Sequence, residues 1–506
     1  MEDKSLESIQ NFSGRYPRQI WSLFFSEMWE RFCFYGMRGM LTFFMIDQLL
    51  MDEGVANLQY GATQAFVYAF TFVGGMFADK ILGFRKSLFW GGLLMIAGSL
   101  ILATDPHRFF FLGISFTVIG TGFFKPNIST MVGQLYKADD VRRDAGFTLF
   151  YGGINLGAFL GGYLCVAIGK GTMLASVVPH GLRWNVAFGL AAVVMVISLV
   201  NFIYTKRRLG PIGLQPTITD KAVNIIPMPK WREYAVFVGT LLLIPVIQIM
   251  VSKPEYTDYF MWTIGPLTLI YLFYEMSKVT AKERKKLWAA LVFILFSILF
   301  WGIYEQSGGS LSIFAARNLN NNLLGFKADP NGVNNSGGAF FIIALSVVFG
   351  MMWIWLAKRK MEPNTVVKFG LGFLLLGAGF YLFFATRLFA NAQGVTSLNF
   401  FTFALLIITF GELCLSPIGL SIMTKLSTPR LQGVMMGMWF LASAYGQYVA
   451  GIIGKNMAEA KTGASNYEAF IAYTQGYKQL GLYAVIAGAV LIIVSPFVRK
   501  LMQEVK

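Results

Sequence analysis

Apolar stretches separated by short polar breaks recur along the whole chain. A helix needs roughly 20 apolar residues to cross the hydrocarbon core of a bilayer, and most of these stretches approach that length. The pattern predicts fourteen membrane-spanning helices, near residues 19–46, 57–79, 87–104, 110–131, 146–169, 184–205, 233–252, 258–277, 287–316, 338–357, 367–386, 399–424, 432–454 and 474–498. We therefore expect an all-α polytopic membrane protein.

The polar breaks divide the predicted spans into two sets of six, with two more spans between the sets. The segment after the first set, residues 206–232, is polar and basic and contains prolines. We expect an N-terminal six-helix bundle at residues 1–205, a linker with two inserted membrane helices at residues 206–286, and a C-terminal six-helix bundle at residues 287–506. Secondary transporters are commonly built from two such repeats with the substrate at their interface.

Composition and charge agree with a membrane protein. Only 13% of the residues are charged and 56% are hydrophobic, whereas an ordinary soluble domain has about 25% charged residues. The net charge is +16, which in a soluble protein would suggest nucleic acid. Here basic residues recur in loops that fall on one side if every span crosses once: residues 206–232 and 278–286, the loop with Lys80, Arg85 and Lys86, and the loop with Lys358, Arg359, Lys360 and Lys368. That side is predicted to be cytoplasmic, as are both termini, and we expect no nucleic-acid partner.

Ionisable side chains occur inside the predicted spans, where they are costly and usually face a cavity or a partner. The set comprises Glu27, Glu30, Arg31, Arg38, Lys125, Glu305 and Glu412. At 100° per residue, three of the four charges on the first helix share an arc of about 80° with Tyr35. The set has one more carboxylate than cations, so one carboxylate is free to take a proton or to hold a substrate ammonium group. Both uses fit a proton-coupled carrier.

The two-fold repeat also suggests which charges meet. If helix n corresponds to helix n+6, Arg38 faces Glu305, and Lys125 faces Glu412. We expect the first pair to close an outer gate and the second pair to close an inner gate. The alternative is that both are static ion pairs that only fix the packing.

The sequence lacks the motifs of an enzyme or of a nucleotide-driven pump. It contains no H-E-x-x-H zinc motif, no nucleophile elbow and no P-loop. Its three cysteines, Cys33, Cys165 and Cys414, lie in apolar runs without metal-site spacing. We expect no catalytic activity, no metal and no cofactor, with a proton gradient as the source of energy.

Several motifs then identify a family. The first helix reads E-M-W-E-R-F-C-F-Y-G from Glu27, the fourth reads F-F-K-P-N-I-S from Phe123, and the tenth begins its motif with G-E-L at Gly411. They resemble motifs of the proton-dependent oligopeptide transporters (POT/PTR) of the major facilitator superfamily, whose bacterial members also have two extra helices. The resemblance covers nearly the whole chain. It implies the major facilitator fold and import of di- and tripeptides with protons by alternating access. It also implies a monomer in the bacterial cytoplasmic membrane.

The same resemblance implies roles for individual residues. Proton coupling would involve Glu27, Glu30, Arg31 and Glu305. Peptide binding would use Arg31 and Lys125 for the carboxylate, Asn155 and Glu412 for the amino terminus, and Tyr35, Tyr68, Trp301 and Trp439 for side-chain pockets. A carrier of the same fold for an amino acid, nitrate or a drug-like compound remains the alternative function.

Two positions depart from the family pattern. Phe34 replaces the first tyrosine of a Y-Y-G run, and Gly338-Ala339 stand where the family usually has Asn-Pro. Asn334 and Asn335, one turn earlier, are candidates to replace the missing asparagine. Recognition of the peptide amino terminus, and the choice between dipeptides and tripeptides, depend on these positions.

Overall fold

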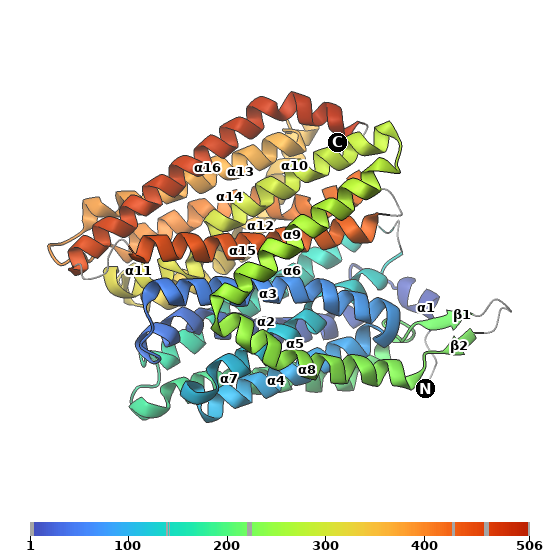
Figure 1. The fold of residues 1–506 in the computed structure, drawn as a ribbon, viewed down its shortest axis with the longest axis horizontal. Helices are drawn as coiled ribbons and strands as arrows, with labels where there is room; N and C mark the ends of the chain where they lie inside the picture. Colours follow the sequence, from blue (N-terminus) through green and yellow to red (C-terminus); the bar gives the residue numbers. More distant parts are fainter. Residues whose placement is uncertain are drawn as a thin grey trace. The chain divides into compact units, whose positions relative to one another are not determined.

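The computed structural model describes residues 5–137, 140, 142–219, 225–427, 431–459 and 465–503, most of which are helical. The long helices are α2 (Gln19–Asp47), α3 (Glu53–Phe77), α4 (Phe84–Thr104), α5 (Pro106–Gln134), α6 (Arg143–Gly169), α7 (Arg183–Thr205), α8 (Lys230–Ser252), α9 (Pro254–Ser277), α10 (Ala281–Tyr304), α12 (Pro330–Lys358), α13 (Thr365–Ala385), α14 (Leu398–Leu426), α15 (Gln432–Glu459) and α16 (Asn466–Met502) (Figure 1). One of these helices coincides with each predicted span, which confirms the all-α fold class.

Short elements connect the long helices. They are α1 (Leu6–Gln10), α11 (Ser310–Asn318) and the turns η1 (Ala78–Leu82), η2 (His180–Leu182), η3 (Lys206–Leu209), η4 (Glu305–Gly308) and η5 (Thr386–Phe389). Two small antiparallel hairpins pair β1 (Thr217–Thr219) with β2 (Ile225–Pro227), and β3 (Asn322–Leu323) with β4 (Phe326–Lys327). The first hairpin, drawn as green arrows in Figure 1, lies in the polar linker.

Eleven helical segments of the described chain are long and apolar enough to cross a membrane by their own composition. The helices α2, α9 and α15 do not reach that standard. In α2 the reason is the charged set found in the sequence, because Glu27, Glu30 and Arg31 interrupt its apolar run and are buried within the protein. A charged side chain is tolerated at membrane depth when it faces protein and not lipid.

The expectation of one continuous helix over residues 287–316 is wrong in detail. The helix α10 ends at Tyr304, the tight turn η4 follows, and α11 starts at Ser310. Gly309 has φ −107° and ψ −109°, a conformation outside the helical region, so the helix cannot continue through it. The break places Glu305 at the end of α10.

The described residues group into two compact units. The first unit contains residues 1–40 and 66–252. Within it, α4 packs against α5 and α7, and α8 packs against α5. Reciprocal hydrogen bonds fix α2 to α7, because the Ser198 hydroxyl donates to the Ser26 carbonyl at 2.6 Å and the Ser26 hydroxyl donates back at 3.3 Å. This attachment positions the charged face of α2.

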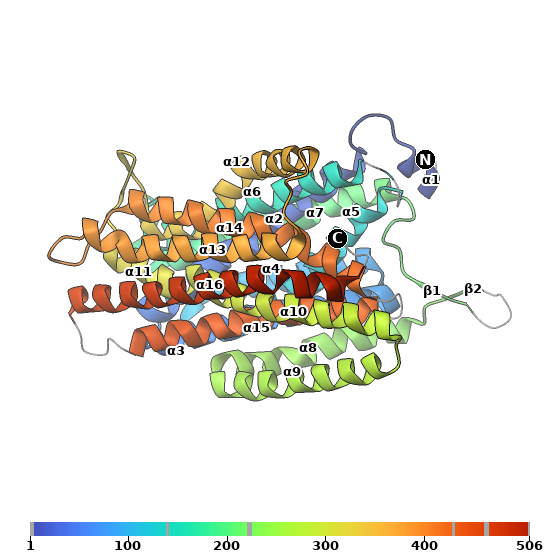
Figure 2. The ribbon, with the colours of Figure 1, turned by 90° about the horizontal axis from the view of Figure 1, so that it is seen from above.

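The second unit contains residues 41–65 and 253–506. Within it, α13 lies alongside α16 in both views (Figures 1 and 2), and α10 packs against α15. The last turns of α2 belong here, and the Thr42 hydroxyl donates a hydrogen bond to the carbonyl of Gly308. The inserted helices α8 and α9 fall into different units. The domain boundaries expected from the sequence remain predictions.

Candidate functional site

Three charged side chains form a buried network on α2, which we call the α2 network: Glu27, Glu30 and Arg31. Each is no more than 1% exposed. Arg31 holds Glu30 with two parallel hydrogen bonds, from Nε to Oε2 and from Nη2 to Oε1, the second at 2.6 Å. The same Nε lies 3.3 Å from Oε1 of Glu27. Two carboxylates thus share one guanidinium, and the contact with Glu30 is bidentate, which is a strong form of ion pair.

The two carboxylates of the α2 network are held differently. Glu30 accepts both hydrogen bonds of the arginine fork. Glu27 is within ion-pair distance, but in the described part of the chain neither of its oxygens has a hydrogen-bond partner. A buried polar atom without a partner is costly. Binding of a proton should therefore stabilise Glu27 more than Glu30.

Aromatic rings lie near the two other predicted site cations of the first unit, Lys125 and Arg38. The ammonium of Lys125, on α5, lies 4.7 Å from the ring centre of Tyr68 on α3. The guanidinium of Arg38 lies 5.6 Å from the ring centre of Tyr35. Such cation–π contacts contribute about 0.5–2 kcal/mol, depending on desolvation. Tyr35 and Tyr68, predicted to line side-chain pockets, thus also position the cations of the site.

The first departure from the family pattern is explained by a similar contact. The Arg31 guanidinium lies 5.0 Å from the ring centre of Phe34, which is buried. The ring face supports a cation with or without a hydroxyl group. Replacing tyrosine by phenylalanine at position 34 therefore keeps this support of the α2 network.

Asn155 on α6 is 5% exposed, and its amide nitrogen donates to the Tyr151 carbonyl of its own helix at 2.9 Å. An ammonium group carries only donors, so it would have to meet the amide oxygen. The structure is therefore compatible with the predicted contact to a peptide amino terminus only through that oxygen.

In the second unit the predicted site residue Glu412, on α14, accepts a hydrogen bond from the hydroxyl of Tyr304 on α10. Tyr304 was not among the predicted site residues. A signal was available, because Tyr304 stands three residues after Trp301 and one turn of helix puts both on the same face. The bond itself joins residues 108 positions apart, and only the packing of α10 on α14 reveals it.

The second departure from the family pattern lies beside this pair. A Cβ atom at Gly338, on α12, would lie 3.6 Å from the Tyr304 hydroxyl and 3.9 Å from that of Thr409. These are ordinary contact distances, so a Cβ atom fits at this position. It would lie next to the hydroxyl that binds Glu412.

The two candidate substitutes behave differently from each other. The Asn335 amide donates to the Asn331 carbonyl of its own helix at 3.0 Å. The Asn334 amide donates to the Ser307 carbonyl of η4 at 2.6 Å, and its oxygen is buried without a partner among the described residues. Asn334 therefore offers a buried acceptor that has no partner among the described residues.

Two tryptophans predicted to line side-chain pockets pack against glycines of neighbouring helices. A Cβ at Gly446 would lie 2.5 Å from Cβ of Trp301, and a Cβ at Gly419 would lie 1.9 Å from Cζ2 of Trp439. The Trp301 ring meets that of Tyr304 edge-on with centres 5.4 Å apart. Its indole nitrogen is buried without a partner in the described part of the chain. Trp301 thus adds a free donor to this region.

Glu305 is 4% exposed and follows the last residue of α10. The neighbouring Gln306 fixes the turn, since its amide donates to the carbonyls of Gly302 and Ala450, each at 3.2 Å. Arg38 and Lys125 belong to the first unit, while Glu305 and Glu412 belong to the second. The two predicted gate pairs therefore remain predictions.

A second arginine–glutamate cluster was not predicted. Arg317 of α11 forms an ion pair with Glu53 of α3, and the Tyr473 hydroxyl of α16 donates to Glu53 at 2.7 Å. We call Glu53, Arg317 and Tyr473 the surface clasp, because the arginine side chain is 45% exposed. All three residues lie just outside the predicted spans 57–79, 287–316 and 474–498, so they are not among the ionisable residues expected inside spans.

Comparison with known proteins agrees with these observations. The model of the POT family (PTR2) matches residues 85–470. The chain is 33% identical to the peptide transporter YePEPT of Yersinia enterocolitica subsp. palearctica serotype O:3 (strain YE-P4), over 97% of this chain and 96% of that protein. It is 31% identical to a di-/tripeptide transporter of Lactococcus lactis subsp. cremoris, over 98% of both. A crystal structure of a mutant peptide transporter POT in complex with alafosfalin matches with a TM-score of 0.80 at 30% identity, over 99% of this chain and 100% of that one.

Proposed function

Because the chain belongs to the POT family, we propose that this membrane transporter imports di- and tripeptides together with protons by alternating access. The observation that carries the proposal is the division of charge. The first unit holds the cations Arg31 and Lys125 beside aromatic rings, and the second holds the acceptor Glu412 with Tyr304. A peptide is a zwitterion, so it needs a basic group for one end and an acceptor for the other.

Proton coupling rests on the α2 network. We assign proton binding to Glu27, since it is the carboxylate of the network without hydrogen bonds among the described residues. A proton on Glu27 leaves Arg31 and Glu30 as a neutral, fully hydrogen-bonded pair, which removes one uncompensated charge from a buried site. Glu305 at the end of α10 is the second proton site.

The proposed mode of substrate binding follows from the placement of the cations in the first unit and of Glu412 in the second. Lys125, held over Tyr68, and Arg31 take the peptide carboxylate, while Glu412 and the oxygen of Asn155 take the amino terminus. Trp301 and Trp439 border the side-chain pockets. Apolar pockets discriminate weakly between similar side chains, so we expect the carrier to accept many peptides.

The transporter needs neither a cofactor nor catalytic chemistry in this proposal. Moving one proton inward through 100 mV yields about 2.3 kcal/mol, which supports roughly a 50-fold concentration gradient. We further propose that it works as a monomer in the bacterial cytoplasmic membrane with both termini in the cytoplasm.

Accumulation of dialanine in liposomes tests the function. Purified protein is reconstituted, and uptake is followed with an inward proton gradient and an inside-negative potential, without ATP. We expect accumulation above equilibrium that a protonophore abolishes, and loss of uptake in Lys125→Ala. Uptake that requires ATP, or no dialanine uptake by correctly inserted protein, would contradict the proposal. A screen with nitrate, single amino acids and drug-like compounds then tests the alternative substrates.

A further inference from the structure

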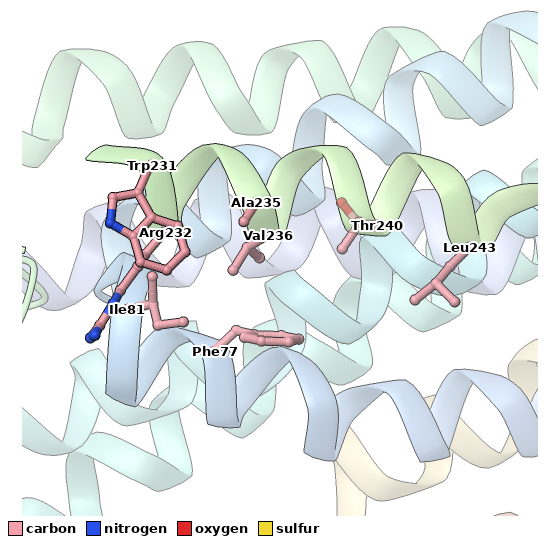
Figure 3. A pocket seen from close by; sticks show the side chains of 9 residues that line it. Phe77, Ile81, Trp231, Arg232, Ala235, Val236, Thr240 and Leu243 are labelled. Carbon is pink, nitrogen blue, oxygen red and sulfur yellow. The ribbon is translucent and has the colours of Figure 1, made fainter. Parts of the chain in front are cut away.

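A groove of about 570 Å³ runs between α8 and the end of α3 with the turn η1 (Figure 3). Phe77 and Ile81 form one wall, while Val236, Gly239 and Leu243 of α8 form the other. Both walls belong to segments that are long and apolar enough to span a membrane, and most of α8 is not buried inside the protein. The groove therefore lies where lipid hydrocarbon surrounds the protein.

The middle of the groove offers only hydrocarbon to an occupant. Its one hydroxyl, on Thr240, accepts a hydrogen bond from the Trp90 indole at 3.0 Å and donates to the Phe237 carbonyl at 2.8 Å. Gly239 adds space, because a Cβ there would meet no atom within 4 Å. A polar solute would lose hydrogen bonds on entering such a surface, whereas an alkyl chain would not.

One end of the groove is basic. Figure 3 shows Trp231 and Arg232 together at one end of the row of lining side chains and Leu243 at the other. In the described part of the chain no carboxylate forms an ion pair with Arg232. Its neighbour Glu233 is already engaged, with Lys86 at 2.7 Å and with the Gln215 amide at 2.7 Å. The exposed indole of Trp231 is typical of the membrane–water interface.

The length of the groove fits one monolayer. From Arg232 to Leu243 the helix rises about 16 Å, at about 1.5 Å per residue. Half of a hydrocarbon core of about 30 Å is about 15 Å. An acyl chain anchored at the basic end would thus reach Leu243 near the middle of the bilayer.

We propose that this groove binds an anionic phospholipid, with the phosphate of the headgroup against Arg232 and one acyl chain along Val236, Gly239 and Leu243. The turn η1, which supplies Ile81, also carries one acidic and one basic residue, Asp79 and Lys80, which together add no net charge. The site is independent of the peptide site, because none of its residues belongs to the proposed transport machinery.

Photo-crosslinking tests this site. The full-length protein is reconstituted with phosphatidylglycerol or phosphatidylcholine that carries a diazirine in the same acyl chain, and the labelled peptides are mapped. We expect label in residues 230–243, with about a fivefold preference for phosphatidylglycerol, since one basic residue contributes about 1 kcal/mol to binding anionic lipid. Label spread evenly over all membrane-facing helices would overturn the proposal.

Two variants and a matched control complete the test. Arg232→Gln should reduce the preference to about one, and an unchanged preference would overturn the assignment of an anionic headgroup. Gly239→Leu fills the groove and should remove the label from residues 230–243. Gly350→Leu is the control, because Gly350 is exposed on α12 and a Cβ there also meets no atom within 4 Å. Equal labelling in Gly239→Leu and in the control would overturn the site itself.

Discussion

The α2 network and the surface clasp contain the same pair of residue types in opposite environments. Arg31 and Glu30 are 1% and 0% exposed, whereas Arg317 and Glu53 are 45% and 17% exposed. Removing one partner of a buried pair leaves an uncompensated charge, but an exposed pair is worth only about 0–1 kcal/mol. Stability should therefore depend strongly on the charges of the first cluster and much less on those of the second.

The largest effect should come from breaking the α2 network. Arg31→Met leaves two buried carboxylates without their cation, and we expect a loss of about 3–5 kcal/mol in unfolding free energy together with loss of transport. Arg317→Met is the matched control and should lose less than about 1 kcal/mol. Thermal unfolding in detergent compares the two. Equal destabilisation would contradict the contrast between the clusters.

Variants should also distinguish the roles of the two carboxylates of the network. Glu27→Gln removes the proposed proton site but keeps the fork between Arg31 and Glu30, so proton-driven accumulation should fall to equilibration while counterflow exchange remains. Glu30→Gln breaks the fork and should impair both. Glu305→Gln should resemble Glu27→Gln. Undiminished proton-driven accumulation in Glu27→Gln would remove that residue from the coupling role.

Loss of the hydrogen bond from Tyr304 to Glu412 should destabilise the protein less than loss of Arg31. Tyr304→Phe removes one donor to Glu412, which should lower the unfolding free energy by about 1–3 kcal/mol. We expect the substitution to weaken the binding of dialanine more than the binding of its amino-blocked analogue. Competition in counterflow measures both affinities. Glu412→Gln should show the same selectivity. An equal loss for both peptides would make these residues part of a gate and not of the amino-terminus site.

A side chain at position 338 should change the affinity for dialanine less than Tyr304→Phe does, and should raise it. Gly338→Asn places an acceptor near the Tyr304 hydroxyl, where a Cβ fits at 3.6 Å. One added hydrogen bond is worth about 1 kcal/mol, so the affinity for dialanine should rise about fivefold. Gly338→Ala, which adds only the Cβ, is the control. No difference between the two variants would show that position 338 does not contact the amino terminus.

The surface clasp should give the smallest effect on stability and the clearest dependence on salt. Exposed charges are screened over about 10 Å at 0.1 M salt and about 3 Å at 1 M. The difference in unfolding temperature between the wild type and Arg317→Gln should therefore shrink as salt rises. A difference that is constant with salt would show that the clasp acts through packing instead of charge.

The sequence predicted the helices and the charged face of α2 because their signals are local. Hydropathy located each span, and the spacing of Glu27 and Arg31 placed both residues on one face of the helix, where Nε of Arg31 lies 3.3 Å from Oε1 of Glu27. The fork to Glu30 was not predicted, since adjacent residues on a helix usually point apart. Only the long arginine side chain makes it possible.

Features that depend on packing between distant segments could not be predicted. The bond from Tyr304 to Glu412 and the clasp between Glu53 and Arg317 join residues far apart in the chain. The break at Gly309 had a local signal, the glycine pair after Ser307, but a glycine pair is also common within tightly packed membrane helices.

Peptide-driven proton movement tests the coupling most directly. Proteoliposomes with equal pH inside and outside, and with potassium and valinomycin to clamp the potential, receive an outside excess of dialanine while a trapped dye reports internal pH. We predict that the lumen becomes acidic, that Glu27→Gln and Glu305→Gln abolish this change, and that blocked dialanine gives a weaker one. Dialanine entry with no change of internal pH would contradict proton-coupled peptide import.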